Sequence, residues 1–305
     1  MATVTLAESA KLTQNLLYAG LITSIVDVNP FYEILPFQDI DGNALSYNRE
    51  KTLGDTQFLG VGGTITAKNP ATFENVTSSL TTLIGDAEVN GLIQATRSNV
   101  NDQKTIQIMS KAKSLGRKFQ DTMINGDGTS DSFKGLSALV TANQTIDVGA
   151  NGADLQFELL DELIDSVKDK DGQVDYILAS ARTIRSYYAL LRALGGATIG
   201  DVVTLPSGRQ VPAYRGVPIF RNDFIATNQS KGTATNTTTL FAGTVDDGSG
   251  KHGIAGLTAR GDAGLRVENV GVSETKDETI TRVKMYCGLA NFSQLGLYAM
   301  PGIKN

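Results

Sequence analysis

The sequence predicts an α+β fold, and three regions of the 305-residue chain carry that prediction. Residues 102–125 form one long helix-compatible run, and residues 41–85 contain two alternating segments joined by a glycine-punctuated tip. Residues 151–256 alternate helical and strand-like segments, which is typical of a compact α/β domain. A chain of this length accommodates one large or two medium domains.

Composition narrows the class of protein. The hydrophobic fraction of 41 % is typical of a globular protein, and the net charge of −5 argues against a dedicated nucleic-acid binder. Its single cysteine excludes an internal disulfide framework and favours folding in a reducing cytoplasm. Cys287 lies in an apolar, strand-like run, so we expect it to be buried.

Residues 1–40 form the expected N-terminal arm. An amphipathic helical pattern covers residues 6–25, and Pro30 and Pro36 then force extended chain. Residues 16–28 are too polar and too short to span a membrane. The segment around the prolines is strongly apolar, and its apolar residues include Phe31, Tyr32, Leu35 and Phe37. The sequence leaves open whether this segment docks on its own domain or lies against another chain.

Residues 41–85 predict a long hairpin with strands at 45–51 and 72–83. The tip between them includes Leu53, Gly54, Phe58, Leu59 and Gly60. A hairpin this long, with few large apolar residues, is not stable alone and therefore needs a neighbour. Its glycines resemble a dinucleotide loop only superficially, because they open no helix and follow no buried parallel strand.

Residues 102–125 predict a rod-like helix. Its apolar line comprises Ile108, Ala112, Leu115, Phe119 and Met123, at steps of 4, 3, 4 and 4. Lys104, Lys111 and Lys118 recur every seven residues on another side. The apolar face is too thin for a central core helix, although the rod spans roughly 35 Å.

The rod ends in a turn rather than in a metal site. Asn125 and Gly126 predict a left-handed stop, after which Phe133 and Leu136 return to a core. The alternating oxygen side chains from Asn125 onward resemble a calcium loop, but Leu136 stands where the bidentate glutamate should be. Turn chemistry explains these residues better.

The α/β region predicts a helix at 154–170, a buried strand at 175–179 and a second helix capped by Ser180. A hairpin at 210–220 turns at Arg215 and Gly216, and another strand covers 239–243. The glycine loop at 246–253 lacks the residues of a phosphate loop, so we expect its His252 to be exposed. Strands follow at 265–272, 278–289 and 292–298.

No motif assembles a catalytic site. The only histidine lies in a glycine loop and the only cysteine in a strand, so no base stands beside a nucleophile. We therefore expect no enzymatic activity, and no catalytic, cofactor-binding or metal-binding residues. A two-carboxylate enzyme is the chemistry that the sequence leaves open.

Four segments, in this order, resemble a known family. They are 119–129 (FQDTMINGDGT) with 133–136 (FKGL), 175–178 (DYIL) before a helix, and 210–219 (QVPAYRGVPI). Together with the arm and the hairpin they resemble the major capsid proteins of tailed double-stranded DNA bacteriophages, which have the Hong Kong 97-type fold. The resemblance implies an N-terminal arm (1–40), an extended E-loop hairpin (41–85) and a peripheral domain with the spine helix (86–150). It also implies an axial α/β domain (151–256) and C-terminal strands shared by both domains (257–305).

The resemblance implies a structural role: self-assembly into hexamers and pentamers of an icosahedral head that encloses double-stranded DNA. Expected partners are further copies of the chain, separate scaffolding and portal proteins, possible decoration proteins, and packaged DNA bound without sequence specificity. No membrane or cofactor is expected. The protein would assemble in the host bacterial cytoplasm and reside in the virion. The scaffold is expected to be separate because the arm begins close to Met1.

The resemblance also implies three groups of site residues. Intersubunit contacts are expected at the E-loop tip (Leu53, Gly54, Phe58, Leu59, Gly60) and in the arm (Phe31, Tyr32, Leu35, Phe37). Lys104, Lys111 and Lys118 are candidates to face DNA, against the alternative of an ordinary solvated helix face. Lys51 and Lys68 lie in the E-loop, but no motif identifies a crosslinking partner. The alternatives are an encapsulin-type nanocompartment shell and a phage decoration or tail protein.

Overall fold

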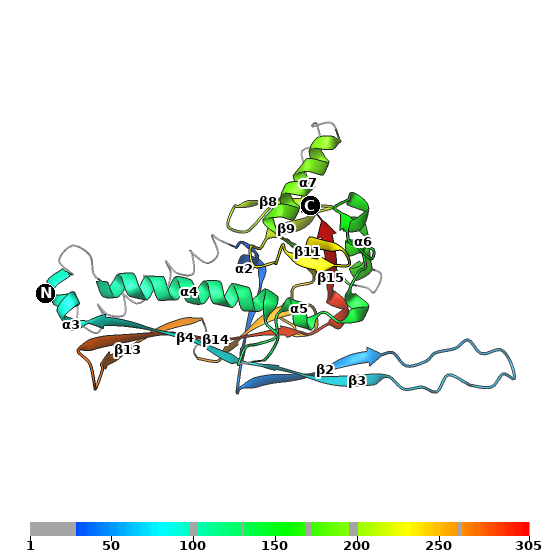
Figure 1. The fold of residues 1–305 in the computed structure, drawn as a ribbon. Helices are drawn as coiled ribbons and strands as arrows, with labels where there is room; N and C mark the ends of the chain where they lie inside the picture. Colours follow the sequence, from blue (N-terminus) through cyan, green and yellow to red (C-terminus); the bar gives the residue numbers. More distant parts are fainter. Residues whose placement is uncertain are drawn as a thin grey trace.

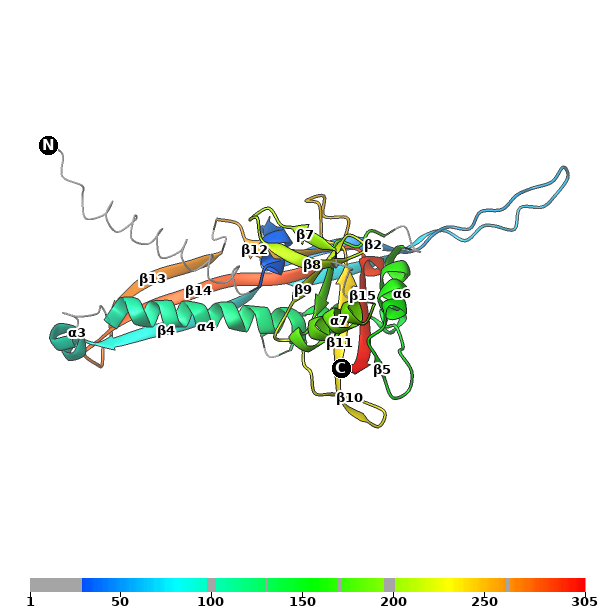
Figure 2. The same ribbon diagram turned by 90° about the horizontal axis from the view of Figure 1, so that it is seen from above.

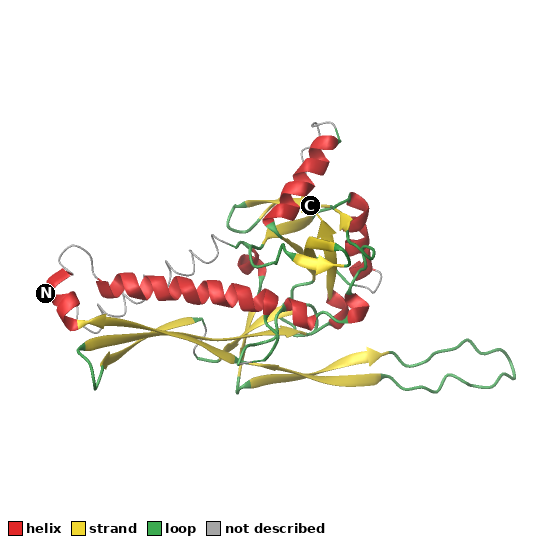
Figure 3. Cartoon of the chain, viewed as in Figure 1, coloured by secondary structure: helices red, strands yellow, loops and turns green. Residues whose placement is uncertain are grey.

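The computed structural model describes residues 29–97, 103–129, 131–168, 172–194, 201–261 and 264–304. These residues build three β-sheets and a long helix, and a two-stranded hairpin projects far from the body (Figure 1; Figure 3). The α+β class is therefore confirmed. None of the described helices has the length and apolar character needed to cross a membrane. The amphipathic helix expected at 6–25 lies outside the described residues.

One sheet supports the long helix. Its five strands are β1 (Phe37–Ile40), β4 (Thr81–Asn90), β12 (Ile254–Ala259), β13 (Leu265–Val272) and β14 (Glu278–Asn291). The 14-residue β14 pairs with β4 along one edge and with β12 and β13 along the other. Helix α4 (Gln103–Asn125) lies along this sheet, and α3 (Gly91–Arg97) precedes it (Figure 1).

The predicted rod-like helix is confirmed in its bounds and in the side that it buries. All five residues of its apolar line are buried. Ile108, Ala112 and Leu115 pack with Ala87 and Val283 of the sheet. The C-terminal part of the line joins the main core instead. The helix is thus a layer on a sheet, and its outer side stays exposed.

The second unit is an eight-stranded sheet with helices α6 (Phe157–Lys168) and α7 (Ala181–Ala193) packed around it (Figure 3). Its strands are β5 (Ala153–Asp154), β6 (Tyr176–Ala179), β7 (Val202–Thr204), β8 (Gln210–Tyr214), β9 (Val217–Arg221), β10 (Gln229–Lys231), β11 (Ala234–Gly243) and β15 (Leu297–Lys304). Ser180 caps α7 as expected, because its Oγ accepts a hydrogen bond from the Thr183 amide at 3.3 Å. The β8–β9 turn also matches the prediction, with positive φ at Arg215 and Gly216.

The hairpin is formed by β2 (Ala44–Thr52) and β3 (Thr72–Ser79), which among the described strands pair only with each other. The expected single strand at 72–83 is wrong, because the chain passes from β3 into β4 at Leu80. The Leu80 amide donates to the Asn43 carbonyl oxygen at 2.8 Å, which closes the root of the hairpin. Figure 2 shows the tip reaching well beyond every other element.

The expected domain boundaries at 85/86 and 256/257 would cut through β4 and β12. The division of the chain into domains stays a prediction. β13 and β14 lie in the five-stranded sheet, and β15 lies in the eight-stranded one. The strand expected at 292–298 begins only at Leu297, after a 3₁₀ turn at Gln294–Gly296. Three short elements complete the chain: α2 (Phe31–Ile34), α5 (Leu136–Leu139) and a 3₁₀ turn (Ala142–Gln144).

The described part of the arm docks on its own chain. Phe31 of α2 is fully buried, with its ring centroid 4.8 Å from that of Tyr176 and 5.7 Å from that of Phe220. Tyr32 and Leu35 are buried in the same cluster, between the end of α4 and the eight-stranded sheet. The expectation that Phe31, Tyr32 and Leu35 contact neighbouring subunits is therefore wrong, because their apolar surface is already covered. Phe37 remains partly exposed.

The end of α4 also differs from expectation. Gly126 does not have a positive φ, so the predicted left-handed stop at Asn125 and Gly126 is wrong. Positive φ occurs later in the turn, at Gly128 and Asp131. Gly126 is needed for a close approach instead, since a Cβ there would lie 2.3 Å from the Phe133 carbonyl oxygen.

We predict that Gly126→Ala costs about 1–3 kcal/mol of unfolding free energy, as overpacking usually does. The hydrogen bond from the Gly135 amide to the Gly126 carbonyl, 2.8 Å long, would have to shift. Urea denaturation of the subunit measures the loss. Gly60→Ala is the matched control, because a Cβ there meets no atom within 4 Å. Equal unfolding midpoints for the two variants would contradict this account.

Candidate intersubunit surfaces

The hairpin tip carries the three most exposed large apolar side chains of the described chain, Phe58, Val61 and Leu53. Phe58 and Val61 are fully exposed, Leu53 is mostly exposed, and Leu59 and Ile65 are about half exposed. The predicted tip residues Leu53, Gly54, Phe58, Leu59 and Gly60 therefore lie together on one projecting loop. Isolated exposed apolar residues are ordinary, but a cluster on a projection marks an interaction surface.

A single side chain braces this tip. The Gln57 amide oxygen accepts hydrogen bonds from the Thr66 amide (2.8 Å), the Thr66 hydroxyl (2.7 Å) and the Ala67 amide (2.7 Å). Its amide nitrogen donates to the Thr64 carbonyl oxygen at 3.1 Å. The two branches of the tip are thereby held together without a strand ladder. Sequence reasoning missed Gln57, since no local pattern reveals which residues a glutamine will bridge.

The strands below the tip are joined by polar cross-strand pairs. The Thr52 and Thr72 hydroxyls lie 2.6 Å apart, and the Asn75 amide donates to the Asn48 side-chain oxygen at 2.9 Å. Such pairs stabilise a ribbon that has no core of its own. The root is fixed to the body by Tyr47, whose hydroxyl donates to the Asn291 carbonyl oxygen at 2.8 Å.

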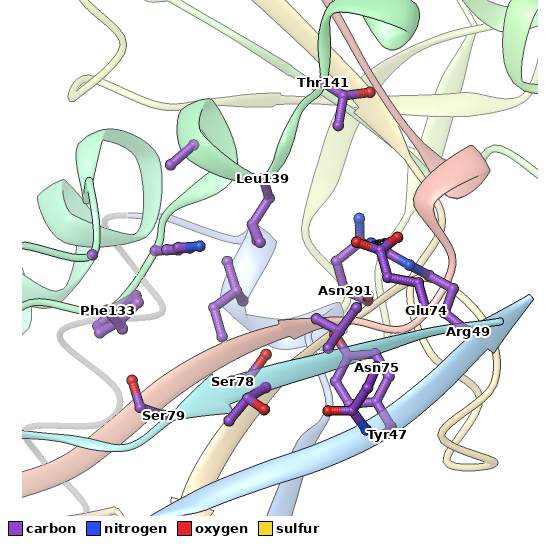
Figure 4. A pocket seen from close by; sticks show the side chains of 16 residues that line it. Tyr47, Arg49, Glu74, Asn75, Ser78, Ser79, Phe133, Leu139, Thr141 and Asn291 are labelled. Atoms are coloured by element: carbon purple, nitrogen blue, oxygen red, sulfur yellow. Dashed lines mark hydrogen bonds and ion pairs between the residues drawn. The ribbon is translucent and has the colours of Figure 1, made fainter. Parts of the chain in front are cut away.

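A groove of about 360 Å³ opens beside this root (Figure 4). One side consists of the hairpin strands, including Tyr47 and Arg49, and the other consists of the segment after α4, including Phe133 and Leu139. Arg49 forms an ion pair with Glu74 at 3.4 Å. The Arg49 Nε and the Asn291 Oδ1 are buried there without a hydrogen-bond partner in the described chain. The groove joins segments far apart in sequence, so no motif could have predicted it.

The three lysines lie on one side of α4, as their spacing predicted, but their surroundings differ. Lys111 and Lys118 are exposed, and Lys104 is half-buried. Lys118 pairs with Asp121 at 3.3 Å. A bidentate Arg282 contact and the nearby Lys111 ammonium lower the pKa of Asp86, with Arg282 the main cause. The row is therefore cationic but partly neutralised, and its role toward DNA stays a prediction.

Asp127 organises the turn after α4. Its carboxylate accepts hydrogen bonds from the Thr129 amide (2.9 Å), the Thr129 hydroxyl (2.5 Å) and the Ser132 hydroxyl (3.1 Å). These bonds, with the Thr129 hydroxyl first, lower the pKa of Asp127 to about 2. The residue that suggested a calcium loop thus acts as a turn anchor.

This lowered pKa predicts a pH dependence. Above the unfolded-state pKa of about 3.9 the carboxylate's bonds stabilise the turn fully, and the contribution is lost as the pH falls toward about 2. Asp127→Asn should therefore be less stable than the natural protein at pH 7. The difference should disappear between about pH 4 and pH 2. Thermal unfolding across this range measures it, with Asp131→Asn as the control in the same turn. A difference that stays constant with pH would refute the assignment.

The described residues place Cys287 and His252 in separate parts of the fold, in strand β14 and in the loop before β12. Cys287 is buried as expected, and burial raises the pKa of its thiol to about 12. His252 is exposed, as predicted. Its loop is organised by the buried Asp246 carboxylate, which accepts from the Gly248 amide at 3.0 Å and the Gly250 amide at 3.1 Å. These amides therefore face a carboxylate rather than a phosphate. No three acidic, histidine or cysteine residues converge for a metal ion within the described ranges.

Comparison with known proteins gives matches in structure but not in sequence. No family model matches the chain, and no curated protein does. The chain is similar to the holo-SrpI encapsulin complex from Synechococcus elongatus PCC 7942, with a TM-score of 0.70 and 18 % identity over 90 % of this chain and 87 % of that chain. It is also similar to the capsid of a native GTA particle, with a TM-score of 0.62 and 14 % identity over 90 % of each chain.

A third similar structure is the capsid of Myoviridae phage XM1, with a TM-score of 0.60 and 12 % identity over 90 % of this chain and 91 % of that chain. At identities this low, the matches establish a shared backbone architecture alone. Each of these matches covers 90 % of this chain. The chain therefore has the Hong Kong 97-type fold, the architecture of phage capsid and encapsulin shells.

Proposed function

We propose that this chain is the major capsid protein of a tailed double-stranded DNA phage. It would assemble into hexamers and pentamers of an icosahedral head, with separate scaffolding and portal proteins, and reside in the virion. The observation that carries this proposal is the projecting hairpin. Its apolar tip touches nothing else in the described chain, so only another molecule can cover it. Closed shells arise when such heterologous contacts rotate around a ring.

A second candidate is an encapsulin-type shell, and one observation favours it. The encapsulin complex superposes with a TM-score of 0.70, against 0.62 for the GTA capsid. Both candidates use the same subunit contacts, and they differ in contents. A decoration or tail protein is a third candidate, which would form rings or tubes or bind to preformed heads.

Negative-stain microscopy of the purified protein, expressed alone and with its neighbouring genes, separates these functions. Shells that require a scaffolding protein and fill with DNA support the capsid. Uniform shells formed by the chain alone around a co-expressed enzyme support the encapsulin. A persistent monomer under all conditions would overturn both.

We further propose that the role is structural and not catalytic. Cys287 supports this because it is buried and its thiol pKa is raised, and His252 supports it because it lies in an exposed loop apart from Cys287. The lysine row of α4 would face the lumen and neutralise DNA phosphates.

We predict that the triple change Lys104→Gln, Lys111→Gln and Lys118→Gln lowers the DNA content of heads. In DNA-binding assays with unassembled subunits, losing three phosphate contacts should reduce the slope of log affinity against log salt concentration by about 3. Lys113→Gln is the control, since Lys113 is exposed on a different side of α4. Unchanged DNA content and salt slope in the triple variant would refute the DNA-facing role, while leaving the shell function standing.

A further inference from the structure

The hairpin tip keeps the register of the strands below it. Residues 53–71, all of them described, form no strand. Counting inward from the last register pair of the ladder nevertheless sets Asp55 opposite Asn69. The Asp55 amide donates to the Asn69 carbonyl oxygen at 3.0 Å, and the Asn69 side-chain amide donates to the Asp55 carboxylate. The first part of the tip is therefore an ordered continuation of the ribbon.

At Gln57 a side chain takes the place of a backbone rung. The same register sets Gln57 opposite Ala67, whose amide donates to the Gln57 side-chain oxygen at 2.7 Å. The Thr66 amide and hydroxyl donate to the same oxygen at 2.8 and 2.7 Å. The Gln57 side-chain nitrogen donates to the Thr64 carbonyl oxygen at 3.1 Å. One side chain thus forms four hydrogen bonds between the two branches of the tip.

A tight turn closes the chain beyond this bridge. The Gly63 amide donates to the Gly60 carbonyl oxygen at 3.0 Å, and φ at Gly62 is +83°, as a type II turn requires. Phe58 and Leu59 lie between the bridge and the turn. Their backbone is therefore held at both ends, although their side chains are exposed.

Without the bridge this segment would have many conformations. The tip contains glycines at positions 54, 60, 62 and 63, and glycine is the residue with the greatest backbone freedom. A segment that must become ordered on binding loses part of its binding free energy. If only about a tenth of the free subunits held the tip in its binding conformation, each contact that the tip makes would weaken about tenfold.

We propose that Gln57 holds the tip in its binding conformation before subunits meet, and so lowers the subunit concentration at which shells form. Gln57 is a positioning residue, because it acts through the segment with Phe58 and Leu59 that it sets in place. The proposal rests on the proposed shell function and adds the residue that prepares the tip for it.

Hydrogen exchange on unassembled subunits tests the bridge itself. The Thr66 and Ala67 amides should exchange slowly in the natural chain. In Gln57→Ala they should exchange at least about tenfold faster, because both amides lose their acceptor. Thr56→Val is the matched control, since the exposed Thr56 forms none of these bonds, and it should leave both rates unchanged. Thermal unfolding midpoints should agree among the three proteins, because the tip lies outside the core.

Assembly of the same proteins tests the consequence. Light scattering should give a threshold concentration for shell formation about tenfold higher for Gln57→Ala than for the natural chain or Thr56→Val.

A disulfide beside the missing bridge separates ordering of the tip from any contact that Gln57 itself makes. Asp55→Cys with Asn69→Cys, added to Gln57→Ala, places two thiols at a hydrogen-bonded register pair, whose Cα separation suits a disulfide. The natural Cys287 is buried with a raised thiol pKa, so it does not compete. Oxidation should restore the natural threshold, and reduction should raise it again.

Three results would overturn the role of Gln57 while leaving the shell function standing. They are fast exchange of both amides in the natural subunit, equal thresholds for Gln57→Ala and the natural chain, and a disulfide-closed variant that assembles no better than Gln57→Ala. Failure of the natural chain to assemble at any concentration would instead overturn the shell function.

Discussion

Replacing residues 53–71 by an Asn-Gly turn will leave the subunit folded and abolish shell assembly. Thr52 and Thr72 are register partners at the end of the ladder, so a two-residue turn can join them directly. The removed side chains are largely exposed, and we expect the unfolding free energy to change by less than about 0.5 kcal/mol. Sedimentation velocity and negative-stain microscopy should then find subunits but no closed shells.

The control for this truncation changes exposed apolar surface elsewhere. Val270→Ser removes an exposed valine of β13 and should leave assembly unaffected. Uniform shells from the truncated chain would show that the hairpin tip is dispensable, and the proposed function would then lose its main support. Loss of the native circular dichroism spectrum would show instead that the hairpin contributes to the subunit's own fold.

Phe31→Ala should cost about 3–5 kcal/mol, the range usual for deleting a buried phenylalanine ring. Phe31 is fully buried where α2, the end of α4 and the eight-stranded sheet meet, so its removal opens a cavity at their junction. The Glu33 carboxylate fixes α2 further, accepting from the Ser207 amide at 2.5 Å and its hydroxyl at 2.8 Å. Urea denaturation of the unassembled subunit measures the loss.

Phe37→Ala is the matched control for Phe31→Ala. The Phe37 side chain is 43 % exposed, although its ring lies 6.2 Å from that of Phe119. Its truncation should therefore cost clearly less than that of Phe31. Equal losses would contradict the placement of α2 in the core, because only a buried ring leaves a cavity.

Much of the fold follows from local patterns in the sequence. The bounds of α4 and the burial of its five apolar residues were predictable because helical periodicity is a property of neighbouring residues. Ser180 and the Arg215–Gly216 turn were predictable for the same reason, since caps and turns depend on a few adjacent residues. The sequence also located the exposed tip, because the hairpin itself has too few apolar residues to cover those at its tip.

Only the tertiary structure decided where the apolar arm residues lie and what the hairpin root forms. The arm segment with Phe31, Tyr32 and Leu35 is equally apolar whether it packs on its own core or on a neighbouring subunit. Where it packs depends on a hollow that is formed by strands distant in the sequence. Glycine is required at position 126 because a Cβ there would collide with the Phe133 carbonyl oxygen. The root groove is lined by residues of β2, β3, α5 and β14. Such sites depend on backbone distances between segments far apart in the chain, which residue spacing along one segment does not encode.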